Sequence, residues 1–258
     1  MGYKPLDLDG KVAVVVGGSS GIGKTIALGL AQAGADVVAS ARRMELVNAL
    51  ADEIESLGRK SLRVSCDVAD RASLEKLLSA CIESFGKIDI LVNAAGITKR
   101  APTLDFAESD WNHIFDTNLT GTLRACQIFG RHMIERRYGR IISIASMGTF
   151  LGLFEVAAYS ASKSGLGSLT KSLAIEWARY GVCVNAIAPG YFLTALNQKL
   201  LTGTGRGHEL LMRTPMQRFG KVEELIGATV FLASDAAAFV TGIILPVDGG
   251  VLASGVNQ

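Results

Sequence analysis

The sequence predicts an α/β protein: a single-domain, doubly wound parallel sheet of the Rossmann type with helices on both faces. Short apolar runs alternate with longer segments that have the apolar spacing of helices. The runs are apolar at nearly every position, as expected of strands that are covered on both faces. Because parallel strands need a crossover connection, this alternation predicts a parallel sheet rather than a series of hairpins.

Seven apolar runs are the predicted strands. They are Val12–Val16, Val37–Ser40, Leu62–Ser65, Ile88–Val92, Arg140–Ile144, Val182–Ala188 and Ile243–Val247. The segments between them are predicted as helices, and the first three end at Gly34, Gly58 and Gly86. Two longer helices are expected over Asn112–Arg136 and Tyr159–Tyr180.

Length and composition favour one folded domain over residues 1–258. Of the 258 residues, 49% are hydrophobic and 19% are charged, which is enough apolar material for a sizeable core. The apolar stretch Leu225–Val247 is long enough to span a bilayer. However, Ser234 and Asp235 interrupt it, so we interpret it as a buried helix followed by a core strand and expect no membrane segment.

The charge balance and the cysteine and histidine content argue against several classes of binding partner. With 26 basic and 24 acidic residues the net charge is +2, which gives no reason to expect nucleic acid or an acidic membrane as a partner. The four cysteines lack metal-site spacing and the three histidines lie far apart, so we expect no metal. We interpret the cysteines as buried free thiols of a reducing compartment. The N-terminus shows no apolar signal sequence, and a cytoplasmic location is expected.

A glycine-rich turn joins the first predicted strand to the first helix. Glycines there let the main chain approach a pyrophosphate, and the helix N-terminus supplies amide donors. The predicted dinucleotide-binding residues of the turn are Gly17, Ser19, Ser20, Gly21, Ile22 and Gly23. Gly17-x-Ser19-x-Gly21 also matches the nucleophile turn of serine hydrolases. That alternative is disfavoured because no strands precede the turn and no HGGG-type segment is present.

Further motifs follow in a fixed order along the chain. They are Asn93-Ala94-Ala95-Gly96 after a strand, Asn118 in a helix, Ser146, Tyr159-x-x-x-Lys163, and Pro189-Gly190-x-x-x-Thr194 after a late strand. In order and spacing, over essentially the whole chain, the set resembles the short-chain dehydrogenase/reductase family. Two positions depart from the family pattern: Val16 stands where the family usually has Thr, and Ala94 replaces the second Asn of its NNAG motif.

The resemblance implies an oxidoreductase that moves a hydride between a nicotinamide and a carbonyl or secondary alcohol. Tyr159 and Lys163 lie at i and i+4 on one helix face, and an ammonium beside a phenol favours the phenolate. We therefore expect Lys163 to make Tyr159 a better acid–base group. The family further implies that Lys163 holds the nicotinamide ribose and that Ser146 holds the substrate oxygen. It also implies that Asn118 anchors a water that relays protons.

The expected cofactor is NADP(H) in preference to NAD(H). Sites for NAD carry an acidic residue at the end of the second strand, whereas this chain has Ser40-Ala41-Arg42-Arg43 there. Arg42 can pair with the 2′-phosphate. By the resemblance, Asp67 and its neighbour Val68 lie at the adenine. The other residues expected at the cofactor are Asn93, Ala94, Gly96, Pro189, Gly190 and Thr194, together with Tyr159 and Lys163.

The substrate is expected to be a sugar acid or a related polyhydroxy ketone. An irregular substrate loop is predicted over about 190–218, after the Pro-Gly turn. Its motifs, the Ser146-Met147 pair and Lys99-Arg100 resemble the gluconate 5-dehydrogenase-like branch of the family. A guanidinium suits a carboxylate, so Arg100 is the expected anchor, with Ser146, Met147 and Tyr191 beside the substrate. The apolar residues after Ser146 leave open a 3-oxoacyl-thioester reductase or a hydrophobic ketone reductase.

A homotetramer is expected, with a dimer as the alternative. The two long predicted helices and Val247-Asp248-Gly249-Gly250 resemble family parts that pack between subunits. One alternative from another functional class is a catalytically idle dinucleotide sensor. It is disfavoured because Ser146, Tyr159 and Lys163 are all present.

Overall fold

Six parallel strands form the central sheet of the structure, a computed structural model that describes residues 3–194 and 198–255. The strands are β1 (Val12–Val16), β2 (Asp36–Ser40), β3 (Ile90–Asn93), β4 (Gly139–Ile144), β5 (Val182–Pro189) and β6 (Ile244–Val247). Their order is β2-β1-β3-β4-β5-β6, and every neighbouring pair is parallel. The chain leaves β1 in one direction and continues to β3 on its other side, which is the switch point where such sheets bind ligands.

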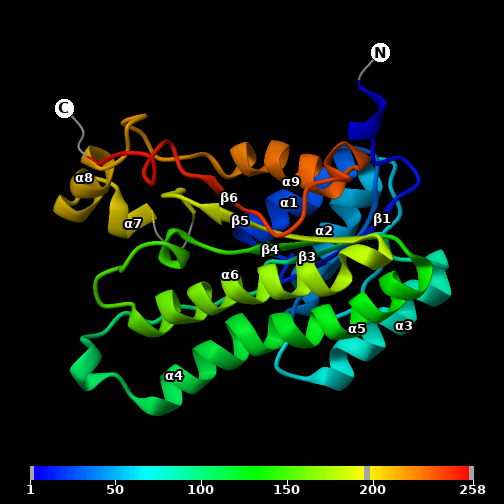
Figure 1. The fold of residues 1–258 in the computed structure, drawn as a ribbon, viewed down its shortest axis with the longest axis horizontal. Coiled ribbons are helices and arrows are strands. Elements are labelled where there is room, and N and C mark those ends of the chain that lie inside the picture. Colours follow the sequence, from blue (N-terminus) through cyan, green and yellow to red (C-terminus); the bar gives the residue numbers. More distant parts are fainter. Residues whose placement is uncertain (1–2, 195–197, 256–258) are drawn as a thin grey trace.

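Helices cover both faces of this sheet (Figure 1). One face carries α1 (Gly21–Gln32), α2 (Met44–Ser56) and α9 (Ile226–Ala233). The other carries α3 (Arg71–Phe85), α5 (Gly121–Arg136) and α6 (Ala157–Trp177). Alternate strand residues serve the two layers: Val15 packs toward α1, whereas Val14 packs toward α5. The predicted doubly wound fold is therefore confirmed.

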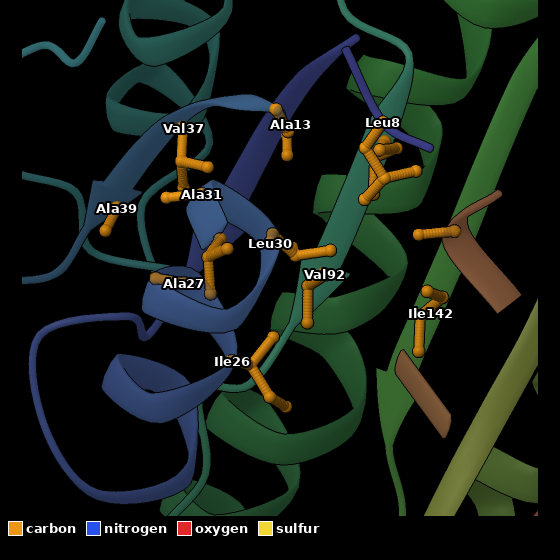
Figure 2. Close-up of a cluster of buried hydrophobic side chains, with 14 of the residues drawn as sticks. Leu8, Ala13, Ile26, Ala27, Leu30, Ala31, Val37, Ala39, Val92 and Ile142 are labelled. Carbon is orange, nitrogen blue, oxygen red and sulfur yellow. The ribbon is translucent and has the colours of Figure 1, made fainter. Parts of the chain in front are cut away.

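The α1 side of the sheet shows why the strands are apolar throughout. Ile26 and Leu30 project from α1 toward Val92 of β3 (Figure 2), and all three are fully buried. Gly29 lets α9 lie close to α1, because a Cβ at Gly29 would be 2.5 Å from a methyl carbon of Ile226. Close packing on both faces fixes the sheet, whose strand ends carry the candidate site.

The remaining elements connect these layers. They are α4 (Glu108–Phe115), α7 (Gln198–Leu201), α8 (Gly205–Met212), the π turn η3 (Asp116–Thr120), and the short 3₁₀ turns η1 (Lys4–Leu6), η2 (Thr103–Asp105), η4 (Met147–Thr149), η5 (Ala178–Tyr180), η6 (Val222–Leu225) and η7 (Asp235–Ala237). The helix expected over Asn112–Arg136 is thus α4 and α5 joined by a π turn. The carboxyl end of β5 points toward α7 and α8 (Figure 1).

The prediction of a strand at Leu62–Ser65 is wrong. This segment runs beside β2, but its flanks make the backbone hydrogen bonds: Val37 donates to the Lys60 carbonyl at 3.0 Å and Cys66 to the Ala41 carbonyl at 3.1 Å. Between them, the Ser40 hydroxyl binds the Val64 carbonyl and occupies a position that a ladder bond would need. Arg63 and Ser65 are exposed, so the segment has one solvated face.

Two other expectations have clear outcomes. The region predicted as an irregular loop over about 190–218 contains α7 and α8, so that prediction is wrong in its local structure. The helix and the strand interpreted within Leu225–Val247 are present as α9 and β6, with a turn that begins at Ser234 between them. The strand is not a core strand, because β6 lies at the edge of the sheet and Pro246 is exposed. Within the described residues, no helix is both long and apolar enough to cross a membrane.

Candidate active site

The glycine-rich turn is held by contacts that exclude any side chain. Gly17 has φ +81°, and a Cβ there would lie 2.4 Å from the main-chain nitrogen of Ala95. A Cβ on Gly23 would lie 2.3 Å from the Gly17 carbonyl oxygen. These two glycines let β1, the start of α1 and the segment after β3 approach one another. The turn therefore requires glycine at both positions.

Gly21, unlike Gly17 and Gly23, has open space at the position that a Cβ would take. It begins α1 and has φ +51°, and no described heavy atom lies within 4 Å of the position that a Cβ would take. Ser20 precedes it in extended conformation and makes no side-chain cap, while Ser19 is buried. Free amide groups of the first helical turn beside open space fit a bound pyrophosphate. The residues present thus fit the dinucleotide that the sequence predicted.

The end of β2 presents a cation to this turn. Arg42 is exposed, and no ion pair of it is found in the described part of the chain. Arg43 follows as the N-cap of α2. Asp36, the acidic residue of this strand, lies at its opposite end, where its carboxylate accepts a hydrogen bond from the Lys60 amide at 2.8 Å. The carboxyl end of β2 therefore offers a positive charge to a ribose substituent.

Ser146, Tyr159 and Lys163 converge beyond β4. Ser146 follows the strand, where its Oγ accepts a hydrogen bond from the Gly148 amide at 3.1 Å and its hydroxyl is hydrogen-bonded to Tyr159. Tyr159 is the third residue of α6, and Lys163 lies one turn later. The Lys163 Nζ is 5.7 Å from the centre of the Tyr159 ring and donates to the Ile144 carbonyl at 2.7 Å. A hydroxyl pair thus lies beside a buried ammonium.

Burial dominates the electrostatics of this group. Burial raises the pKa of Tyr159, and the hydrogen bond with Ser146 opposes that rise. Burial lowers the pKa of Lys163 to about 8. Lys163 donates its short hydrogen bond to the Ile144 carbonyl, and the phenol of Tyr159 is desolvated. The expectation that Lys163 makes Tyr159 a better acid–base group stays a prediction.

Asn118 joins the π turn to the segment after β3. Its Oδ1 accepts from the Ile97 amide at 2.8 Å and its Nδ2 donates to the Ile97 carbonyl at 2.9 Å. The Nδ2 also donates to Ser162 Oγ at 3.1 Å. Asn118 is fully buried, and a π turn between α4 and α5 brings it there. Its side chain is thus committed to protein partners, and the water relay expected of it stays a prediction.

The comparisons with known proteins agree with this arrangement. Residues 11–204 match the sequence model of the family described as short chain dehydrogenase. The chain belongs to the short-chain dehydrogenase family. It is 40% identical over 247 residues to gluconate 5-dehydrogenase of Gluconobacter oxydans, and the match covers 96% of each chain. The predicted family, and with it the predicted class of oxidoreductase, is confirmed.

Two further relatives are similar over nearly their whole length. The 2-dehydro-3-deoxy-D-gluconate 5-dehydrogenase of Escherichia coli is 42% identical over 247 residues, which cover 95% of this chain and 97% of that one. A gluconate 5-dehydrogenase from Burkholderia cenocepacia, solved with NADP and tartrate, is 41% identical with a TM-score of 0.92, covering 97% of this chain and 98% of that one. NADP, the expected cofactor, is the one bound in that structure.

The cofactor residues expected after β3 occupy two different environments in this short-chain dehydrogenase. Asn93 is buried inside the protein, where its Nδ2 donates to Cys126 Sγ at 3.4 Å and to Ser143 Oγ at 3.3 Å. Its Oδ1 is buried with no hydrogen-bond partner. Gly96, by contrast, adjoins the site: a Cβ there would be 3.5 Å from both Asn118 Oδ1 and Lys163 Nζ. A contact of Asn93 with the cofactor stays a prediction.

The expected adenine residues lie in the turn before α3. The Asp67 carboxylate accepts from the Ala69 amide at 3.0 Å, so it shapes its own turn. Val68 is buried against α5, where a Cβ on Gly121 would be 2.9 Å from its side chain. A contact of Asp67 or Val68 with adenine stays a prediction.

The end of β5 supplies the last residues expected at the nicotinamide and substrate. After Pro189, the Gly190 amide donates to the Val247 carbonyl at 2.9 Å, and a Cβ on Gly190 would be 2.6 Å from the Asp248 Cα. Tyr191 is half-buried, and burial raises its pKa. The Thr194 carbonyl accepts from the Gln198 amide at 3.0 Å. These residues start the segment that leads into α7, while 195–197 lie outside the described residues.

Two of the expected substrate residues have neighbours that the sequence did not predict. Met147 is 2% exposed, so its side chain belongs to the interior. Arg100 forms an ion pair with Glu155, whose Oε2 lies 2.6 Å from Arg100 Nε. The role of Arg100 as the carboxylate anchor stays a prediction. Glu155 carries no motif, and only its distant partner and its positive φ of +62° distinguish it.

Neither a metal-binding cluster nor a reactive thiol is found among the described residues. All four cysteines are free and buried, as interpreted from the sequence, and burial raises the pKa of each thiol. No group of three or more His, Cys, Asp or Glu side chains among the described residues is arranged to hold a metal ion. The groups found at the candidate site are hydroxyl, ammonium and guanidinium groups.

Proposed function

We propose that this short-chain dehydrogenase uses NADP(H) to interconvert a keto sugar acid and the corresponding hydroxy acid. The pair to test first is 5-ketogluconate and gluconate. The observation that carries the reaction class is the hydrogen-bonded Ser146–Tyr159 pair beside the buried Lys163 ammonium. This group lies at the same edge of the sheet as the glycine turn, because all the strands are parallel.

The side chains of this group have separable roles in the proposed reaction. NADPH, when bound, supplies the hydride. Tyr159 gives its hydroxyl proton to the substrate oxygen during reduction and takes it back during oxidation. Ser146 holds that oxygen through its hydroxyl, which orients the carbonyl toward Tyr159. Lys163, whose Nζ lies beside Gly96, provides positive charge next to the phenol and holds a ribose hydroxyl.

The preference for NADP rests on Arg42. Its guanidinium is exposed at the end of β2 and free of ion pairs with described residues, so it can take a phosphate through two parallel hydrogen bonds. A carboxylate, which would bind the two ribose hydroxyls of NAD, is missing from that position. The Burkholderia relative with bound NADP supports the same choice.

The sugar-acid substrate rests on Arg100 and on the relatives. Arg100 uses only its Nε in the ion pair with Glu155, so its two Nη atoms stay available to a carboxylate. The similar enzymes of Gluconobacter and Escherichia are named for gluconate and a gluconate derivative, and the Burkholderia enzyme was solved with tartrate, itself a hydroxy acid. These observations support a carboxylated polyol as the substrate class.

A hydrophobic carbonyl compound is the second candidate. Phe150, Leu151 and Phe154 follow the catalytic serine and are 45%, 41% and 74% exposed. Apolar side chains that are exposed beside a binding site favour an apolar ligand. An aryl ketone or an acetoacetyl thioester would fit them better than a sugar acid would.

Rates with three substrates decide between these candidates. Oxidation of NADPH is followed at 340 nm with 5-ketogluconate, an aryl ketone and an acetoacetyl thioester, for the wild type and for Arg100→Ala. The proposal requires the highest kcat/KM with 5-ketogluconate and a selective loss of that activity, about tenfold or more, in Arg100→Ala. A higher kcat/KM with either of the other compounds would reject the sugar acid.

We also propose a homotetramer that works in the cytoplasm. Ile175 on α6 and Phe239 after η7 are 81% and 104% exposed, and side chains of this size favour burial between subunits. The buried free thiols support a reducing compartment. Light scattering at micromolar concentration should give four times the mass of one chain, whereas a monomer would refute the proposed assembly.

A further inference from the structure

Two loops that flank the catalytic group are tied together at Arg100 and Glu155. The Arg100 Nε donates to Glu155 Oε2 at 2.6 Å. One residue later, the Ala101 amide donates to the Glu155 carbonyl at 3.0 Å. The first loop follows β3 and Gly96, and the second joins Ser146 to α6. A side-chain bond and a main-chain bond therefore act on the same two segments.

Glu155 adopts a backbone conformation that costs free energy. Its φ is +62°, and the other non-glycine residues with positive φ in the described part of the chain are Arg137 and Gln217. Glutamate in this region is disfavoured by roughly 1 kcal/mol, a cost that glycine would not bear. An exposed ion pair contributes no more than that. The pair does not stabilise the fold enough to account for a glutamate here.

The contact with Glu155 leaves the outer edge of the guanidinium available. Among the described residues, no hydrogen-bond partner is recorded for Nη1 or Nη2 of Arg100, and its Cζ lies 6.0 Å from the centre of the Phe154 ring. The side chain of Arg100 is 42% exposed and that of Glu155 24% exposed. Held at Nε, the planar guanidinium has a fixed direction in which it can meet a second carboxylate with both Nη groups.

The position of Glu155 links this direction to the chemistry. Val156, the N-cap of α6, follows it directly, and Tyr159 lies in the first turn of that helix. The contact with Glu155 therefore ties the Arg100 guanidinium to the start of the helix that carries Tyr159. A sugar acid whose carboxylate is gripped by Arg100 would present its carbonyl at a defined distance from the proton donor.

We propose that Glu155 is a positioning residue that makes this site select carboxylated substrates. It acts by holding the Arg100 Nε, so that the Nη edge is free to receive the substrate carboxylate. The guanidinium then lies between two carboxylates, that of Glu155 and that of the substrate. The inference rests on the proposed function, since it assigns a role toward the sugar-acid carboxylate. Neutral ketones do not use this arrangement, so their binding does not depend on Glu155.

The test uses two substitutions at this position. Glu155→Gly removes the carboxylate and relieves the positive φ, so the protein is expected to fold with a melting temperature near that of the wild type. Glu155→Gln removes the charge but keeps an amide oxygen that can accept from Arg100 Nε. Glu55→Ala is the matched control, because it breaks the exposed ion pair between Glu55 of α2 and Arg63, remote from the site.

Steady-state kinetics with NADPH are compared for 5-ketogluconate and for a polyhydroxy ketone without a carboxylate. Glu155→Gly should raise KM for 5-ketogluconate about tenfold or more, with kcat changed less than about threefold. Glu155→Gln should recover part of that loss. Neither variant should change KM for the neutral ketone or the dissociation constant of NADPH, and Glu55→Ala should match the wild type throughout.

Two results overturn the inference alone. One is an unchanged KM for 5-ketogluconate in Glu155→Gly, and the other is an equal rise in KM for the neutral ketone, which would mean a purely structural role. A wild-type protein that neither reduces 5-ketogluconate nor binds it in calorimetry with NADP present would overturn the proposed function together with the inference. The two failures are thus distinguished by the wild-type measurement.

Discussion

Asn118 and Ile97 bind each other through both polar groups of each partner. The amide side chain accepts from the Ile97 N–H at 2.8 Å and donates to the Ile97 carbonyl at 2.9 Å. The pairing satisfies an otherwise unpaired peptide in the segment after β3, next to Gly96. Asn118 reaches that peptide because the helix widens into a π turn at Asp116–Thr120. The widened turn therefore supports the segment at Gly96, where a Cβ would lie 3.5 Å from both Asn118 Oδ1 and Lys163 Nζ.

Replacing Asn118 by alanine should damage both stability and turnover. The Ile97 amide and carbonyl would lose their partners in a half-buried place, which costs up to about 3 kcal/mol of the free energy of unfolding. Turnover should fall as well, because Gly96 and Lys163 lose their support. Urea unfolding and kcat measure the two effects. Thr122→Val is the control: it removes a bond to the Asn118 carbonyl but leaves the Ile97 pairing intact, and it should cost less in both measurements.

The parts of this site that could be predicted from sequence are those that depend on local spacing. Tyr159 and Lys163 share a helix face because they are four residues apart, and the glycine turn needs glycine wherever strand, turn and helix crowd together. The π turn at Asn118 has no compositional signature, so the sequence indicated only a helix there. The pairing of Arg100 with Glu155 joins residues 55 apart in the chain, which no periodicity reveals.

The errors in the fold have similarly physical causes. Leu62–Ser65 has the apolar pattern of a strand, but a side-chain bond from Ser40 replaces the ladder, and a tertiary contact of this kind is not encoded in the segment itself. Glycines and charges between Tyr191 and Arg218 favoured a loop, yet α8 begins there with Thr204 as an N-cap that accepts from the Gly207 amide. The burial that raises the pKa of Tyr159 could not be predicted either, because the spacing of residues in a helix indicates proximity and not burial.

Substitution of Gly21 should weaken the cofactor site without unfolding the protein. No described atom lies within 4 Å of a Cβ at Gly21, so Gly21→Ala introduces no clash. Its only cost in free energy of unfolding comes from the φ of +51°, which alanine disfavours. The new methyl group would enter the space assigned to the pyrophosphate. The dissociation constant of NADPH, measured by fluorescence, should rise about tenfold or more.

Gly58→Ala is the matched control for that experiment. Gly58 also has positive φ, +77°, and also has no heavy atom within 4 Å of its Cβ position, but it ends α2 away from the site. Both variants should therefore lose a similar free energy of unfolding, about 1 kcal/mol. Equal NADPH affinity in the two variants would contradict the placement of the pyrophosphate at Gly21.

Arg42→Asp should reverse the cofactor preference. The substitution removes the cation expected to meet the 2′-phosphate and installs a carboxylate that repels phosphate and can bind ribose hydroxyls. The ratio of kcat/KM for NADPH to that for NADH should fall by about a hundredfold or more. Arg43→Asp serves as the control and should change the ratio much less, because Arg43 begins α2. If Arg42→Asp leaves the ratio where it was, Arg42 does not read the phosphate.

The buried lysine should make the stability of the cofactor-free protein depend on pH. Burial lowers the pKa of Lys163 to about 8 from 10.5. Between these values the unfolded chain keeps the proton that the folded protein has lost, so the free energy of unfolding rises with pH. Tyr159, whose pKa is raised, acts in the opposite direction only above its ordinary value of 10.

The measurement that isolates Lys163 is the difference between the wild type and Lys163→Met. From pH 8 to 9.5, urea unfolding should show the wild type gaining up to about 2 kcal/mol relative to the variant. Other titrating groups cancel in the difference, since both proteins carry them. A difference that stays flat over this range would show that Lys163 titrates at its ordinary pKa.

Tyr159→Phe should remove turnover while leaving cofactor binding intact. The substitution keeps the ring and its packing on α6 but removes the hydroxyl that pairs with Ser146 and carries the exchangeable proton. A general acid–base group contributes roughly 100-fold or more, so kcat should fall by at least that factor. The dissociation constant of NADPH should stay within about twofold of the wild type, because Lys163 and the glycine turn are untouched. Tyr180→Phe, at the far end of α6 in η5, is the matched control and should retain full activity. A Tyr159→Phe protein with near-normal kcat would mean that the proton comes from another group, and Ser146 would then be the first residue to test.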